Sequence, residues 1–519
     1  MRFISVTASL LVARQARAAL RVDLNSADSI KEAASLVAAD LLTYYHGDEP
    51  GQTPGILPGP PPAGDYYWWE SGALWGTLID YWHYTGDSTY NELITSSMLF
   101  HTGPPLNAYM PENYTISMGN DDQGFWGLSA MLAAETGFPD PPPNKPQWLQ
   151  LAQAVFHTQA DPERHDTVCG GGLRWQIPMA NVGYDYKNSI SNGIFFNLGA
   201  RLARYTGNET YAQHARETWD WMIAVGLMTE DGDVYDGAHT GVNCTDVFKA
   251  QFSYNAAVFL QGAAFMYSFT QGEEQLLWQS RVQSLLDRTI SFFFRIGPII
   301  ELSCETPTAI ICKTDMLSFK GYTHRWMAST AQLAPFTHDT IMRVLRNSTT
   351  AAVNSCQGPL HNGRACGFRW TTGGYDGLTG AGQEMSVLAA LSSLLVDFAD
   401  DQTRRKGGPL TGETGGTSKG DPHAGTGKGA EAGDPNKVQR EMTGGDTAGA
   451  WLLTVFTLGT MVAAFVLMGT GWFEDREGLD AAAAKVAENN KSGQEEEEEE
   501  RKLGVWYKIV REVVFRHQG

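Results

Sequence analysis

The chain has 519 residues and a hydrophobic fraction of 42%, which is enough for one large domain with an extensive core. Its formal net charge is −20, and the run of glutamates at 495–500 contributes six of these charges. This acidity argues against a nucleic-acid partner, because phosphate binding requires a basic surface. The 15 Trp, 19 Tyr and 23 Phe would suit a sugar-binding site, although core packing is the commoner use of any single ring.

The first 18 residues have the pattern of a signal peptide. Arg2 precedes an apolar stretch from Phe3 to Ala13, and the small-residue motif Ala16-Arg17-Ala18 matches a cleavage site. Four glycosylation sequons follow in the chain, and they also favour the secretory pathway. They lie at Asn113, Asn208, Asn243 and Asn347.

The six cysteines form an even set without any C-x-x-C motif, which favours disulfides over a metal or redox site. Their closeness in sequence favours the pairs Cys304–Cys312 and Cys356–Cys366, and Cys169–Cys244 would remain. This is one of fifteen possible connectivities, so the pairing stays an expectation.

Residues 19–400 are predicted to form one domain with a repeated helical pattern. Helices that are apolar nearly all round are expected at 72–85, 125–136, 192–206 and 254–269, and a looser copy begins at Gly382. Glycine follows the first three copies closely and the fourth after Gln271, as at a helix C-terminus. Amphipathic helices such as 209–225 and 273–294 lie between the copies. The pattern predicts an all-α barrel of inner and outer helices, in which residues preceding each inner helix converge on one cleft.

Asp121 and Asp122 precede the second apolar helix and are the candidate catalytic pair. The plain structural alternative is a helix N-cap followed by an acidic first-turn residue. The functional interpretation is glycoside hydrolysis, in which one carboxyl group protonates the leaving oxygen and the other meets the developing oxocarbenium ion. Adjacent residues at a helix start can hold their carboxyl groups roughly 5 to 5.5 Å apart, the spacing of retaining enzymes. Repulsion between the two charges would raise one pKa.

Four segments together carry a resemblance to glycoside hydrolase family 76, in particular to fungal cell-wall mannan endo-1,6-α-mannosidases. These segments are Asn120-Asp-Asp-Gln-Gly-Phe-Trp, Asn188-Ser-Ile-Ser-Asn-Gly, Tyr254-Asn255 and Phe319-Lys-Gly-Tyr-Thr-His-Arg-Trp. The resemblance implies an (α/α)6 barrel that cleaves α-1,6-mannan with retention. For fungal members it also implies a transglycosylase activity that transfers GPI-linked mannoproteins onto cell-wall glucan.

The resemblance assigns roles to six residues. Asp121 would be the nucleophile and Asp122 the general acid/base, while Trp126, Asn192, Tyr254 and Lys320 would contact sugar. For Asn192 and Tyr254 the alternative is helix capping, and for Lys320 it is a surface or loop-stabilising pair. Tyr254-Asn255 is followed by two alanines instead of the family's frequent Gln-Gly, so the sugar contacts are expected to differ there. No cofactor is expected, and the scattered histidines predict no metal site.

The C-terminal part is predicted to be a tether. Residues 401–446 read as a flexible Gly/Thr-rich, disordered stalk, and the uncharged run 447–473 is long enough to cross a bilayer. That run is either a transmembrane helix or a GPI signal, and the tail 474–519 is expected to be disordered or loosely helical. The catalytic domain would lie outside the cell, at the plasma membrane or cell wall.

Two other functions stay open at this point. One is a catalytically idle mannan-binding or wall-structural protein on the same barrel. The other is a lyase, for which His324 could serve as the base.

Overall fold

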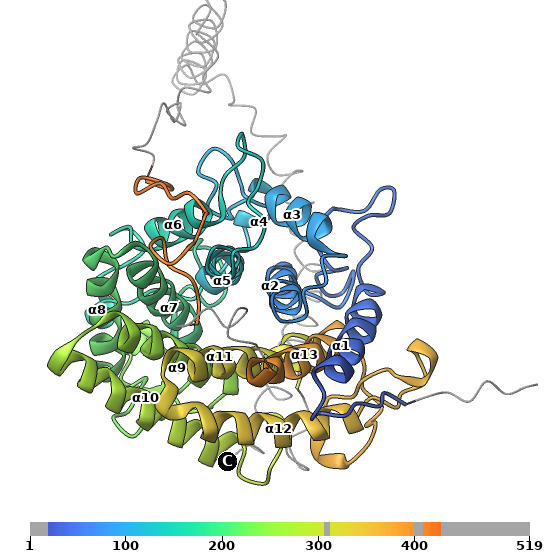
Figure 1. Cartoon of the computed structure of the whole chain (residues 1–519). Coiled ribbons are helices and arrows are strands. Elements are labelled where there is room, and N and C mark those ends of the chain that lie inside the picture. Colours follow the sequence, from blue (N-terminus) through green and yellow to red (C-terminus); the bar gives the residue numbers. More distant parts are fainter. Residues whose placement is uncertain (1–18, 306–311, 399–407, 427–519) are drawn as a thin grey trace, which may run out of the picture. The chain divides into compact units, whose positions relative to one another are not determined.

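The computed structural model describes residues 19–305, 312–398 and 408–426. Within these ranges helices supply nearly all of the regular secondary structure, and long loops connect them (Figure 1). The α-helices are α1 (Ala27–Leu42), α2 (Trp68–Thr85), α3 (Asn91–Phe100), α4 (Glu112–Thr115), α5 (Asn120–Thr136), α6 (Trp148–Gln159), α7 (Ser189–Thr206), α8 (Glu209–Ala224), α9 (Ser253–Phe269), α10 (Gly272–Phe293), α11 (Phe319–Leu333), α12 (His338–Asn354) and α13 (Ala381–Leu394).

Six helices of the described chain form a closed inner ring. The helices α2, α5, α7, α9, α11 and α13 each contact the next, and α13 closes the ring on α2. A partner covers each of them on the outside: α3, α6, α8, α10, α12 and α1, in the same order. The predicted all-α (α/α)6 barrel is confirmed.

The inner helices are buried along most of their length, as their apolar sequences predict. In α2 every residue from Trp69 to Tyr81 is buried, and α7 is similarly enclosed. The helices α2 and α5 end at Gly86 and Gly137, whose φ angles of 80° and 67° place them in the left-handed region that favours glycine. The helix α9 ends differently, at an extended Thr270, and the glycine beyond it starts α10.

Loops at one end of the barrel carry a small antiparallel sheet. Its strands, in the order β1-β2-β3, are β1 (Tyr186–Asn188), β2 (Gly237–His239) and β3 (Val247–Phe248). The register pairs Asn188 with Gly237 and Gly237 with Phe248. The remaining regular elements of the described chain are short 3-10 helices: η1 (Val168–Gly170), η2 (Thr240–Val242), η3 (Thr314–Ser318), η4 (Pro335–Thr337), η5 (His361–Gly363), η6 (Trp370–Thr372) and η7 (Leu395–Phe398).

All six cysteines are paired. The disulfides are Cys169–Cys244, Cys304–Cys312 and Cys356–Cys366, which confirms the expected connectivity. The four sequon asparagines are exposed, so each is accessible to modification.

The prediction of a flexible stalk is wrong for residues 408–426, which we call the C-terminal strap (orange in Figure 1). The backbone N–H groups of Leu410 and Gly412 donate to the carbonyls of Glu135 and Tyr205, in the last turns of α5 and α7. The Ser418 hydroxyl accepts from the N–H of Leu149, at the start of α6. Helix ends leave such groups without intrahelical partners. The strap is ordered because it satisfies them, a gain that composition does not reveal.

A chain that ends at residue 407 should be less stable than one that ends at 426. Leu410 is almost fully buried, and burial of a leucine side chain contributes about 1.5–3 kcal/mol. With the lost hydrogen bonds, we expect the free energy of unfolding to fall by about 2–4 kcal/mol. Denaturant titration of the two chains measures the difference. Equal stability would restore the flexible-stalk interpretation.

The predicted signal peptide, the apolar run 447–473 and the tail 474–519 lie outside the described residues. Among the residues that are described, no helix is both long and apolar enough to cross a membrane.

Candidate active site

A cleft of about 580 Å³ opens at the N-terminal ends of the inner helices. Residues at or just before the first turns of α2, α5, α7, α9 and α11 line it, together with loops around the small sheet. Among the residues that the structure describes, the lining includes four carboxylates and no lysine or arginine. The full set is Tyr67, Trp69, Ser117, Asp121, Asp122, Phe125, Trp175, Gln176, Tyr186, Asn188, Ile190, Asp236, Phe248, Phe252, Tyr254, Asp315, Met316 and Phe319.

Asp121 and Asp122 both face this cleft from the first turn of α5. The backbone N–H of Gly119 donates to Asp122 Oδ2 at 2.6 Å. Asp122 therefore does cap the start of α5, as the structural alternative predicted. Asp121 receives two donors: the Asp122 N–H to Oδ1 at 3.0 Å and Asn188 Nδ2 to Oδ2 at 3.1 Å. Capping and exposure to the cleft are therefore compatible in this pair.

Burial raises the pKa of both aspartates. It raises the pKa of Asp122 to about 6, and the charge of Asp315 adds to the increase. Burial and the charge of Asp122 raise the pKa of Asp121 well above its usual range, while the hydrogen bond from Asn188 opposes the shift. Burial thus favours a proton on Asp121, and its two N–H donors favour the charged form. Asp121 accepts two such hydrogen bonds and Asp122 only one, so the donors favour a charged Asp121 beside a protonated Asp122.

Two further carboxylates in the cleft were not predicted from the sequence. Asp236 precedes β2 and accepts a hydrogen bond from the Tyr186 hydroxyl at 2.8 Å, and burial raises its pKa. Asp315 lies in η3, and burial raises its pKa as well. Both occur in irregular segments without a motif, so only the fold brings them to the cleft.

Tyr254 also lines the cleft, at the start of α9. Its ring stacks on Phe319 with centroids 3.7 Å apart and an interplanar angle of 11°. It caps no helix, because the N-cap of α9 is Phe252. Exposed rings stand nearby in the lining: Tyr67, Trp175 and Phe248 are 44%, 36% and 60% exposed. These rings are available for contact with a ligand.

The structure corrects the expected sugar contacts of Trp126 and Asn192, because both side chains are fully buried and outside the cleft lining. Trp126 lies one turn below Asp122, where its ring fills the space over Gly72 of α2 and stacks on Trp68. Asn192 Nδ2 donates to the carbonyl of Leu173 at 3.0 Å, and its Oδ1 accepts from the N–H of the same residue at 2.7 Å. It ties a loop to α7.

Lys320 is corrected in the same way. It is fully buried on α11, outside the cleft lining, and Nζ lies 2.7 Å from Glu305 Oε2 and donates to the carbonyl of Phe368 at 2.7 Å. Lys320 therefore stabilises loop segments, as the alternative proposed, but its ion pair is buried and does not lie on the surface. His324 is also fully buried, and burial lowers its pKa to about 4. Because it does not line the cleft, it cannot act as the base of a lyase there.

Comparison with known families agrees with this architecture. The model of Glycosyl hydrolase family 76 matches residues 29–406, the inner and outer helices together with the cleft. The chain belongs to glycosyl hydrolase family 76. The predicted resemblance is thus confirmed.

Two curated relatives in the family come from Saccharomyces cerevisiae. Mannan endo-1,6-alpha-mannosidase DCW1 is 41% identical over 451 residues, covering 86% of this chain and 95% of the relative. Mannan endo-1,6-alpha-mannosidase DFG5 is 37% identical and covers 90% of this chain and 97% of the relative.

Solved structures share the barrel. Dfg5 from Chaetomium thermophilum, in complex with glucosamine, is 53% identical with a TM-score of 0.74, and the match covers 78% of this chain and 98% of that one. An inactive variant of a family 76 alpha-1,6-mannanase from a Salegentibacter species, in complex with alpha-1,6-mannotriose, matches with a TM-score of 0.56. That match is only 14% identical over 70% of this chain and 99% of the other, so it shows the fold alone.

Proposed function

We propose that this chain is a mannan endo-1,6-α-mannosidase that acts with retention through Asp121 and Asp122. The observation that carries the proposal is a pair of adjacent carboxyl groups, facing one cleft, whose pKa values are both raised. One proton shared by such a pair supplies an acid and a carboxylate at the same time. The relatives DCW1 and DFG5 are mannan endo-1,6-alpha-mannosidases, and we take the same substrate class, α-1,6-linked mannan, for this chain.

In the first step, an oxygen of Asp121 attacks the anomeric carbon, and the bond from that carbon to the leaving oxygen breaks. The proton of Asp122 moves to the leaving oxygen. In the second step, Asp122 takes a proton from an incoming hydroxyl, whose oxygen displaces Asp121 from the anomeric carbon. The rings of Tyr254, Trp175 and Phe248 provide surfaces against which sugar faces can pack.

The second step decides between hydrolysis and transfer. Water gives hydrolysis, and a sugar hydroxyl gives a transglycosylase. We infer that the biological substrate is cell-wall mannan or the glycan of a GPI anchor, with wall glucan as an acceptor in the transfer reaction. The chain would then work outside the cell, tethered to the membrane by the apolar C-terminal segment.

The pH dependence of activity should follow the aspartate pair. Because the first step needs Asp122 protonated, kcat/KM should fall as pH rises through about 6, by about tenfold per unit on the limb. The same raised pKa means that the folded chain binds a proton that the unfolded chain has lost, between pH 3.8 and about 6. The free energy of unfolding contributed by Asp122 should therefore decrease as pH rises through this interval. Rate profiles and denaturant titrations across this range measure both effects.

Incubation of the purified protein with α-1,6-mannan oligosaccharides, with and without a β-glucan oligosaccharide, tests the proposal. Mass spectrometry should show shorter mannan products, and mixed products if transfer occurs. A chain that binds the oligosaccharide without cleaving it would instead support the idle wall protein. Unsaturated products that absorb in the ultraviolet would support a lyase.

A further inference from the structure

The side chain of Asn188 connects the cap of one inner helix to the catalytic pair on another. Asn188 ends β1 and is the N-cap of α7, where its Oδ1 accepts from the backbone N–H of Ser191 at 3.3 Å. Its Nδ2 donates to Asp121 Oδ2 at 3.1 Å. Only the amide oxygen can accept from a helix N–H, so the cap fixes which way the amide lies and turns its nitrogen toward Asp121.

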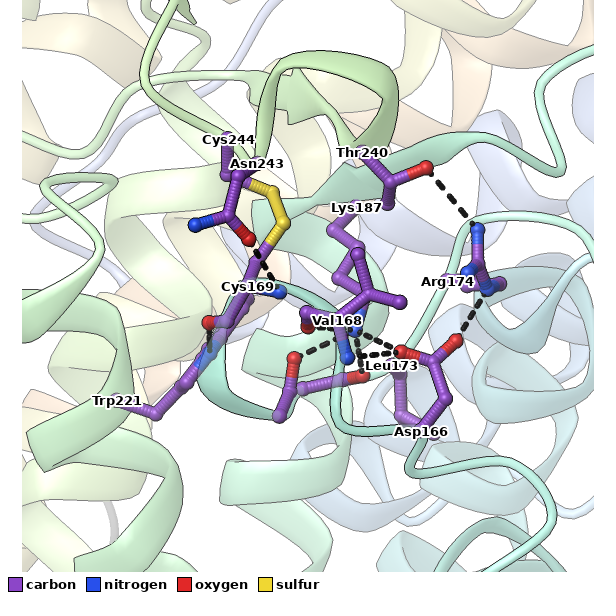
Figure 2. Close-up of polar contacts among 12 residues, drawn as sticks. Asp166, Val168, Cys169, Leu173, Arg174, Lys187, Trp221, Thr240, Asn243 and Cys244 are labelled. Carbon is purple, nitrogen blue, oxygen red and sulfur yellow. Dashed lines mark hydrogen bonds and ion pairs between the residues drawn. A yellow bond between two sulfur atoms is a disulfide. The ribbon is translucent and has the colours of Figure 1, made fainter.

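The segment that leads into Asn188 is held rigidly (Figure 2). Lys187 is fully buried beneath the loop 166–172, and its Nζ is surrounded by four acceptors. These are Asp166 Oδ1 at 2.8 Å and the carbonyls of Val168, Gly171 and Gly172 at 2.8, 2.6 and 3.0 Å. A buried ammonium with so many partners leaves the backbone of β1 little freedom to shift.

The same loop is bound at several other points. Arg174 pairs with Asp166 at 2.5 Å, and the disulfide Cys169–Cys244 joins the loop to the segment between β2 and β3. The Nδ2 atom of Asn192 donates hydrogen bonds to the backbone carbonyls of Leu173 and Asn188. The loop, the sheet and the start of α7 therefore form one framework.

Asp121 is attached to this framework from its own side. The N–H of Asn120, the preceding residue, donates to the carbonyl of Trp175 at 2.8 Å, and Asn120 Nδ2 donates to the carbonyl of Arg174 at 2.9 Å. The residues that precede Asp121 and Asn188 are therefore both fixed to the stretch 166–175. The backbone is thus anchored on both sides of the hydrogen bond from Asn188 to Asp121, and this anchoring fixes the geometry of the bond.

We propose that Asn188 is a positioning residue that holds the Asp121 carboxylate in the orientation for attack on the anomeric carbon. This inference rests on the proposed function and adds a residue that acts through Asp121 without touching the substrate bond. The neutral N–H donor binds one oxygen of Asp121, and the Asp122 N–H binds the other. Both donors favour the charged, nucleophilic form of the carboxylate over the protonated one.

Two substitutions separate positioning from helix capping. In Asn188→Ser the capping oxygen remains and the donor to Asp121 is lost; in Asn188→Asp the cap and the shape remain, but a carboxylate oxygen faces Asp121. We expect kcat of Asn188→Ser on α-1,6-mannan oligosaccharides to fall about 10- to 100-fold, with KM changed less than about twofold. The acid limb of its kcat/KM profile, where Asp121 loses its proton, should move up by about one pH unit because the donor that favours the charged form is gone. In Asn188→Asp, repulsion should move the limb further and lower kcat below that of Asn188→Ser.

A purely capping role predicts the opposite order, because aspartate and serine cap comparably well and aspartate keeps the native shape. Ser26→Asp is the control, since Ser26 caps α1 by accepting from the N–H of Ser29, outside the cleft lining. Its pH profile should equal that of the wild type. If the wild type is active and Asn188→Ser keeps its acid limb, this inference is overturned and the proposed function stands. If the wild type cleaves no α-1,6-mannan, both are overturned.

Discussion

Replacing either aspartate of the pair should abolish turnover while leaving the barrel folded. For Asp122→Asn we expect kcat to fall about 10³-fold, because the leaving oxygen loses its proton donor. For Asp121→Asn we expect a loss of about 10⁴-fold or more, because the nucleophile is gone. Initial rates of α-1,6-mannan oligosaccharide cleavage measure both.

Folding is the control for this prediction. The amide oxygen introduced by Asp122→Asn can still accept from the Gly119 N–H, so the start of α5 keeps its cap. Since burial raises the pKa of Asp122, removing its charge should leave the melting temperature at pH 7 unchanged or higher. Asp185→Asn, at an exposed carboxylate outside the cleft lining, should keep activity within about twofold of the wild type. Retention of turnover by both active-site variants would refute the mannosidase assignment.

Lys320→Met should cost stability more than sugar binding. The substitution leaves Glu305 as a buried charge without its ion-pair partner, and Glu305 Oε1 already has no hydrogen-bond partner. Loss of one member of a buried pair typically costs about 3–5 kcal/mol, and we expect a decrease of that size in the free energy of unfolding. Denaturant titration measures it directly.

The same variant distinguishes the structural role from the sugar contact expected from the motif. A sugar-contacting lysine would raise KM and leave the free energy of unfolding unchanged. The double variant Lys320→Met with Glu305→Gln should recover part of the lost stability, because residue 305 then carries no unpaired charge. Lys249→Met removes an exposed lysine and should change stability by less than about 0.5 kcal/mol.

Sequence patterns predicted the barrel because its inner helices are apolar on all sides. The inner helix α11 lacks this pattern, since it carries buried polar residues such as Lys320, Thr323 and His324. Its polar groups are satisfied by partners distant in sequence, such as Glu305 and the carbonyl of Phe368. Pairing between residues so distant in sequence leaves no recognisable pattern within the sequence of α11 itself.

Only part of the candidate site could be predicted, because a local sequence pattern does not show contacts between residues that are distant in sequence. Asp121 and Asp122 follow from a local motif at a helix start, and Tyr254 from another. Trp126 belongs to the first of these motifs and Asn192 to the segment that begins at Asn188, but both lie about one turn into their helices, where each packs on a neighbouring element. Asp236 and Asp315 reach the cleft only through the loops that precede β2 and α11. A motif therefore identifies a helix start, whereas the fold decides which of its side chains face the cleft.

The proposed covalent step can be observed by intact-mass analysis of Asp122→Asn after exposure to α-1,6-mannobiosyl fluoride. Fluoride leaves without being protonated, so the first step should proceed, while the second step lacks its base. We expect a gain of one mannobiosyl residue on the protein, located by peptide mapping at Asp121, and no such gain in the double variant that also carries Asp121→Asn. A covalent sugar on another residue, or turnover of the fluoride by the double variant, would contradict it.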